Sequence, residues 1–133
     1  MGSTIDTFKT THQAVTGLLE LVGSSKGQQR AEALSSLKEA VLSHIEDENR
    51  VIHEAMNKPD ADGSFKSSAE GFLEELGNIA QSALLPFFDK YSSSDIVDSN
   101  EFMGDFGGIK GALSDRISFE EETFYPELEK MAY

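Results

Sequence analysis

Apolar residues recur at intervals of three and four positions along four long stretches of the chain, a spacing typical of amphipathic α-helices. Segments rich in glycine, proline, serine and aspartate interrupt this pattern, and they lie at residues 23–25, 59–63 and 92–95. The sequence therefore predicts four helices, which cover residues 5–22, 34–55, 65–87 and 102–131. No stretch alternates between apolar and polar residues for long enough to predict a β-strand.

Two prolines fall inside the predicted helices and should distort them. Pro86 lies near the end of the third helix, and Pro126 lies near the end of the fourth. Because proline lacks an amide hydrogen and crowds the preceding turn, we expect a bend or a step at each position. Four amphipathic helices joined by short turns pack most simply as an antiparallel up-down-up-down bundle. We therefore expect an all-α protein in which residues 1–133 form a single four-helix domain.

The charge balance excludes several classes of partner. The chain of 133 residues carries 24 aspartates and glutamates against 11 lysines and arginines, for a formal net charge of -13. Such a surface repels phosphate groups, so neither nucleic acid nor an anionic membrane is an expected partner. The chain has no cysteine, which excludes thiolate ligands and a cysteine nucleophile and fits a cytoplasmic protein. Any metal site would use histidine and carboxylate ligands.

A few polar residues fall on the apolar faces of the predicted helices. On the second helix, His44 and Glu48 are four residues apart and therefore share the apolar face. On the fourth helix, Arg116 and Glu120 have the same spacing, and on the first helix His12 lies within the apolar stripe. We expect these five side chains to point inward and to converge. Other polar residues should face solvent, namely His53, Glu70, Glu74, Glu121 and Glu122.

The inward-facing charged groups need partners, because burying an unpaired charge costs several kcal/mol. Two interpretations provide such partners. In the first, a transition metal is bound, and imidazole and carboxylate ligands favour iron, manganese or zinc. Its ligands would be His12, His44, Glu48 and Glu120. In the second, no metal is bound and the guanidinium of Arg116, which cannot ligate a metal, bridges Glu48 and Glu120.

The same residues give the chain a resemblance to the hemerythrin-like family, the HHE cation-binding domains. The motifs that carry it span nearly the whole chain: Thr-His12-Gln-Ala-Val, Leu42-Ser-His-Ile-Glu-Asp-Glu48 and Ile117-Ser-Phe-Glu-Glu-Glu-Thr-Phe-Tyr-Pro126. In that family, two helices each carry a histidine followed four residues later by a carboxylate that bridges two irons. His44 and Glu48 match one such pair completely. The other pair is half matched, because Arg116 replaces the histidine while Glu120 keeps the carboxylate position.

The resemblance implies a reduced metal site. His12 and His44 correspond to histidines of the iron that has an open, oxygen-binding position, and most of the missing ligands belong to the other iron. We therefore expect a mononuclear site of His12, His44, Glu48 and Glu120, with Arg116 near the space of the second metal. Such a site implies binding of O2, NO or a peroxide for sensing, storage or protection. The alternative is a metal-free member of the family that acts as a regulatory or partner-binding module.

A stripe of glycines lies roughly opposite the apolar face of the predicted fourth helix, and its members are Gly104, Gly107, Gly108 and Gly111. Small residues let helices approach closely, so a second subunit or a partner helix could pack there. Glycine also weakens helices, and we expect these residues chiefly to loosen or delay the start of the fourth helix. The chain shows no serine-histidine-aspartate array, so its sequence supports no assignment as an enzyme.

Overall fold

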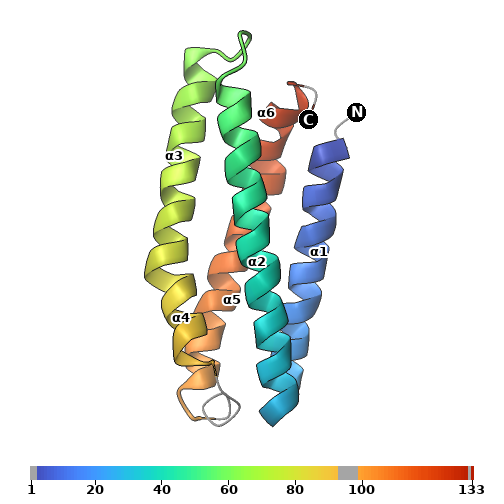
Figure 1. Cartoon of the computed structure of the whole chain (residues 1–133), viewed down its shortest axis with the longest axis vertical. Coiled ribbons are helices and arrows are strands. Elements are labelled where there is room, and N and C mark those ends of the chain that lie inside the picture. The colour runs from blue at the N-terminus through green and yellow to red at the C-terminus, as the bar shows by residue number, and fades with distance from the viewer. Residues whose placement is uncertain (1–2, 93–98, 132) are drawn as a thin grey trace.

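The structure, a computed structural model, describes residues 3–92, 99–131 and 133. Four long helical rods account for most of the described residues, which include no β-strand (Figure 1). The first two rods are α1 (Ser3–Ser24) and α2 (Gly27–Met56). The third consists of α3 (Gly63–Ile79), η1 (Ala80–Leu84) and α4 (Leu85–Lys90), and the fourth of α5 (Phe102–Phe119), η2 (Glu120–Phe124) and α6 (Tyr125–Glu129). Residues 93–95 of the predicted segment between the last two rods lie outside the described residues.

Each rod runs antiparallel to the one before it, so both ends of the chain lie at the same end of the bundle (Figure 1). There, the amide nitrogens of Thr4 and Ile5 donate hydrogen bonds of 3.1 and 3.2 Å to the carbonyl oxygen of Tyr133. These bonds join the first turn of α1 to the last residue of the chain. The predicted all-α, up-down-up-down four-helix bundle is therefore confirmed.

The distortions predicted at the two prolines are π-helical turns. η1 and η2 are five residues long, and each comes directly before a short α-helix with proline in its first two positions. In a π turn, each backbone amide bonds to the carbonyl five residues back instead of four. This shift lets the helix continue through the proline, which has no amide hydrogen to donate. Both rods continue through the proline, Pro86 in the third and Pro126 in the fourth.

The second helix begins earlier than its apolar pattern predicts. α2 starts at Gly27, whose φ of 57° lies in the left-handed region that glycine adopts without steric cost. Arg30, in the first turn, is buried and donates a 2.9 Å hydrogen bond from its Nε to the carbonyl oxygen of Val22. Its guanidinium also lies 4.8 Å from the centre of the Phe102 ring. A search for apolar periodicity could not detect this turn, because its buried side chain is charged.

The buried apolar side chains form two clusters, one toward each end of the bundle. The first includes Leu19, Leu37, Leu84, Phe87, Phe102 and Phe106, and the second includes Ile5, Phe65, Phe72, Phe124 and Leu128. On α1, His12 lies between Phe8 of the second cluster and Val15 of the first. His44 and Glu48 are likewise buried in the middle of α2. A layer of buried polar side chains therefore separates the two apolar clusters.

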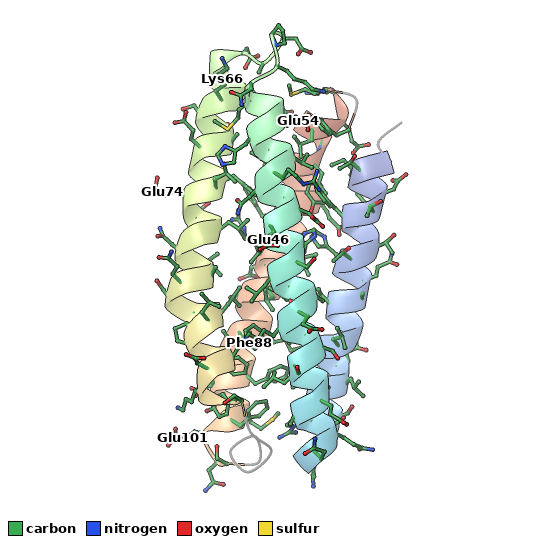
Figure 2. All side chains as sticks on the ribbon, in the orientation of Figure 1. Glu46, Glu54, Lys66, Glu74, Phe88 and Glu101 are labelled. Atoms are coloured by element: carbon green, nitrogen blue, oxygen red, sulfur yellow. The ribbon has the colours of Figure 1, made fainter. Side chains whose placement is uncertain are left out.

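Most acidic residues stay on the surface, where water solvates them. Glu74 and Glu101 project away from the bundle (Figure 2), and Glu46 and Glu54 are exposed as well. Glu70 and His53 are also exposed, so these two and Glu74 face solvent as predicted. No helix in the described part of the chain is both long and apolar enough to cross a membrane.

The glycine stripe of α5 is open. Its four glycines are exposed, and a Cβ atom added at any of them would meet nothing within 4 Å. α5 begins at Phe102, ahead of all four, so these glycines do not delay the start of the helix. A second subunit or a partner helix on this face stays a prediction.

Candidate metal centre

Two histidines and two glutamates meet in the polar layer between the apolar clusters. His12 comes from α1, His44 and Glu48 come from α2, and Glu120 is the first residue of η2. One nitrogen or carboxylate oxygen from each residue lies within 4.8 Å of the other three. All four residues are buried, with exposed fractions from 0 % for Glu48 to 8 % for His44. The structure thus brings together all four residues that the sequence analysis named as candidate ligands.

The distances between these atoms suit a single metal ion. The Nε2 atom of His12 lies 2.8 Å from Glu120 Oε1 and 3.0 Å from His44 Nε2. The Nε2 atom of His44 lies 3.3 Å from Glu48 Oε1. Metal–ligand bonds of about 2.0–2.2 Å place neighbouring ligand atoms roughly 3–3.5 Å apart and opposite ones roughly 4.2 Å apart. Shifts of a few tenths of an ångström would therefore let all four atoms reach one ion.

Tyr125 belongs to the same cluster, although the sequence analysis did not select it. Its hydroxyl lies 2.7 Å from Glu48 Oε2 and 3.0 Å from Glu120 Oε1. At about 100° per residue, a regular helix would place Glu120 and Tyr125 roughly 140° apart. The π turn of η2 bonds each residue to the fifth one along and so brings both onto one face. The sequence signal that could have identified Tyr125 is the proline that follows it, because proline predicts irregular backbone at this point.

Glu121 is half-buried, so the prediction that it faces solvent is wrong. Its Oε2 atom lies 2.7 Å from Nδ1 of His12, and its side chain is 35 % exposed. Glu121 follows Glu120 at the edge where η2 faces α1, so its carboxylate reaches the outer nitrogen of the buried imidazole. That contact orients His12 with its other nitrogen, Nε2, toward the cluster. Glu122, by contrast, is exposed as predicted.

Arg116 lies beside the cluster and pairs with only one of its two carboxylates. Its Nε atom is 3.7 Å from Glu120 Oε2, and its Nη1 atom is 3.5 Å from Glu75 Oε2. The guanidinium lies 4.3 Å from the centre of the Phe72 ring and 4.9 Å from that of Phe119. The described residues include no ion pair between Arg116 and Glu48. The bridge of the metal-free interpretation is therefore formed on the Glu120 side alone, because the two rings hold the guanidinium there.

A cavity of about 30 Å³ adjoins the cluster, large enough for a water-sized molecule. Its walls are formed by the four candidate ligands, Arg116 and a set of apolar residues: Val15, Val41, Ile45, Leu76, Ile79, Leu84, Leu113 and Ile117. Two buried atoms of these walls, Glu48 Oε1 and Arg116 Nε, make no hydrogen bond among the described residues. A buried polar atom without a partner is costly. Glu48 Oε1 therefore has the position and the free lone pair of a metal ligand.

Mutual contacts shift the pKa values of the cluster in opposite directions. Burial opposes charge on His44, but its interactions with Glu120 and Glu48 outweigh burial and raise its pKa to about 9. Burial opposes charge on Glu120 as well, yet hydrogen bonds from His12 and His44 lower its pKa to about 2. For Glu48, burial dominates and raises the pKa to about 7. The pKa of the Tyr125 hydroxyl lies well above its usual range because of burial and the adjacent carboxylates.

These shifts predict the pH dependence of stability for the metal-free protein. The raised pKa of His44 stabilises the fold below about pH 6.5, and this contribution is lost as pH rises through 9. The raised pKa of Glu48 acts in the same direction, with loss between about pH 4.5 and 7. Chelator-treated protein should therefore have a lower free energy of unfolding at pH 9 than at about pH 5.5, measured by urea denaturation. An equal or higher value at pH 9 would contradict the assigned contacts.

Comparison with known families identifies the class of protein. Residues 3–128 match the family described as Hemerythrin HHE cation binding domain. The match covers nearly all of the chain, so this protein belongs to the hemerythrin HHE family, and the resemblance carried by the three motifs is confirmed. Domains of this family bind metal cations, and the histidine and carboxylate cluster fits such a site. The comparisons with curated proteins and with solved structures gave no match.

Proposed function

We propose that this hemerythrin-like domain, spanning residues 1–133, binds a single iron ion and uses it to bind O2, NO or a peroxide. The ligands are His12, His44, Glu48 and Glu120. The observation that carries the proposal is the convergence of one buried ligand atom from each of these residues to within 4.8 Å of the others. Manganese and zinc use the same types of ligand and are the alternatives to iron.

Contacts outside the ligand set support a metal over a simple hydrogen-bonded cluster. The hydrogen bond of 2.7 Å between His12 Nδ1 and Glu121 Oε2 is the arrangement in which a carboxylate orients a metal-binding histidine. The buried Glu48 Oε1 lacks a hydrogen-bond partner among the described residues, as expected of an atom that ligates an ion. The unpartnered Glu48 Oε1 would be costly in a domain that never binds metal.

Arg116 explains why one metal ion suffices. In the resemblance described above, Arg116 replaces a histidine of the second iron, and a permanently protonated guanidinium repels a cation placed near it. Its contacts with Glu120 and Glu75 offset the negative charge that a second iron would otherwise balance. The bound iron would supply an open coordination position. The chain would supply a mostly apolar cavity of about 30 Å³ next to that position, which has room for a small ligand.

Metal analysis tests the proposal directly. Protein expressed in iron-supplemented medium should contain close to one iron per chain, and iron(II) added to the chelator-treated protein should raise its melting temperature. If iron, manganese and zinc are all present only in traces, and none of them shifts the melting temperature, the proposal fails. The metal-free regulatory or partner-binding module would then be the better description.

Glu121 offers a mutational test of the same site. The Glu121→Ala substitution removes the carboxylate that orients His12, and we expect it to weaken metal binding by about 10–100-fold. The matched control is Glu122→Ala, which removes an equal charge from the neighbouring exposed position. Affinities from competition with a metallochromic chelator would measure both variants. Equal affinities for the two variants would show that Glu121 has no role in the metal site.

A further inference from the structure

One buried side chain, Tyr125, contacts every proposed metal ligand. Its hydroxyl oxygen lies 2.7 Å from Glu48 Oε2, 3.0 Å from Glu120 Oε1, 3.1 Å from His12 Nε2 and 3.4 Å from His44 Nε2. A phenol has a single hydrogen to donate, so it cannot form good donor bonds to all of these atoms at once. A cation held between His12 Nε2, His44 Nε2 and Glu120 Oε1 would have this oxygen within reach as a further ligand.

The Tyr125 ring is fixed, so its oxygen cannot move away from a bound ion. Tyr125 is 0 % exposed. Its ring stacks on the His12 imidazole at 5.5 Å between centroids and 12° between planes, and it packs against Phe8 at 5.7 Å. The π turn of η2 sets the direction in which the side chain leaves the backbone. The phenol ring is thus held by packing against two rings of α1 as well as by its hydrogen bonds.

With iron(III) bound, the charge of the site would favour an additional anionic ligand, although burial and the adjacent carboxylates keep the phenol protonated in the metal-free site. Ionised Glu48 and Glu120 contribute two negative charges, and neutral imidazoles contribute none. A phenolate at Tyr125 raises the total to three, which equals the charge of iron(III), and a buried site is least costly when its charges balance. Phenolate is an anionic oxygen ligand that proteins use for iron, as the proximal tyrosine of catalase shows.

Building on the metal site proposed above, we infer that Tyr125 is a fifth ligand and binds iron(III) through its phenolate oxygen. As the iron–oxygen bond forms, the phenol O–H bond breaks and its proton leaves to solvent, with no change in oxidation state. These five residues would hold the iron, and the adjoining cavity would leave room for a small exogenous ligand. The site should therefore prefer iron(III) to zinc(II), whose charge the three anionic ligands exceed.

The test is the optical spectrum of protein loaded with iron(III), supplied as its nitrilotriacetate chelate. Wild-type protein should show a visible phenolate-to-iron(III) charge-transfer band, and resonance Raman excitation in that band should enhance tyrosine ring modes. Tyr125→Phe should lose the band and bind iron(III) at least about tenfold more weakly. The control Tyr91→Phe changes another buried tyrosine, which donates to Asp105 away from the site, and should keep the band. Zinc-loaded protein should be colourless.

The outcomes separate this inference from the proposed function. Wild-type protein that holds one iron(III) per chain without the band, or a Tyr125→Phe variant that keeps it, overturns the assignment of Tyr125 and leaves the metal site standing. Wild-type protein that binds no metal overturns both. If Tyr125→Phe does not fold, the Raman spectrum of the wild-type protein and the Tyr91→Phe control still decide the question.

Discussion

Replacing His44 with alanine should abolish the stabilisation that iron gives to the folded protein. At an iron concentration a thousand times its dissociation constant, binding should stabilise the wild-type fold by about 4 kcal/mol, or roughly 10 °C or more in melting temperature. The imidazole of His44 lies 3.0 Å from the Nε2 of His12 and 3.3 Å from Glu48 Oε1, so its removal opens one side of the proposed site. We expect no shift of the melting temperature on adding iron to the His44→Ala variant.

The chain offers a matched control on the same helix. His53 is exposed and lies nine residues further along α2, so His53→Ala should keep the full iron-dependent shift. Thermal denaturation followed by circular dichroism, with and without iron, would measure the shift for each protein. The difference between the two conditions is the informative quantity, because His44→Ala also alters the metal-free fold. An undiminished iron shift in His44→Ala would exclude His44 from the site.

Replacing Glu120 with alanine should give the largest loss of stability in the metal-free protein. Its carboxylate accepts or pairs with groups from three directions: His12 at 2.8 Å, Tyr125 at 3.0 Å and Arg116 at 3.7 Å. Removing one member of a buried charged network leaves the others without a counter-ion, and we expect a cost of about 3 kcal/mol. This loss of unfolding free energy should lie at the lower end of the range usual for a broken buried ion pair. The reason is that the two histidines can lose a proton, and Arg116 keeps its ion pair with Glu75.

Urea denaturation of the chelator-treated protein would measure this loss. Glu122→Ala serves as the control, since it removes the same charge from an exposed position of the same π turn and should change the free energy of unfolding by no more than about 0.5 kcal/mol. If the two variants are equally stable, the buried network contributes nothing to the fold. The carboxylate of Glu120 would then be retained for ligand binding alone.

The polar layer has a consequence for the bundle as a whole. The apolar core forms two clusters, and the ionisable groups of the site lie between them. Those groups stabilise the fold only while their charges match. We therefore expect an ion bound at this layer to stabilise the folded bundle by joining the three helical rods that carry the ligands.

The sequence alone was sufficient for the four helices, apart from the first two turns of α2, and for the inward position of the four candidate ligands. Apolar spacing identifies the buried face of a regular helix, and His12, His44, Glu48 and Glu120 lie on those faces in continuous α-helix or at its end. Their burial follows from the same 3.6-residue period that buries their apolar neighbours. The up-down-up-down order also follows, because short connections force successive helices to run antiparallel.

Three features depended on the tertiary structure. Tyr125 enters the site only because the π turn of η2 breaks the helical period. Glu121 contacts the site because η2 faces α1 at the level of His12. Arg116 lies beside Glu120 because the rings of Phe72 and Phe119 hold its guanidinium there. Each depends on contacts between separate helices or on backbone irregularity, which a fixed period along one helix cannot represent. The sequence by itself thus determined which residues turn inward, and the packing of the helices decided which atoms meet there.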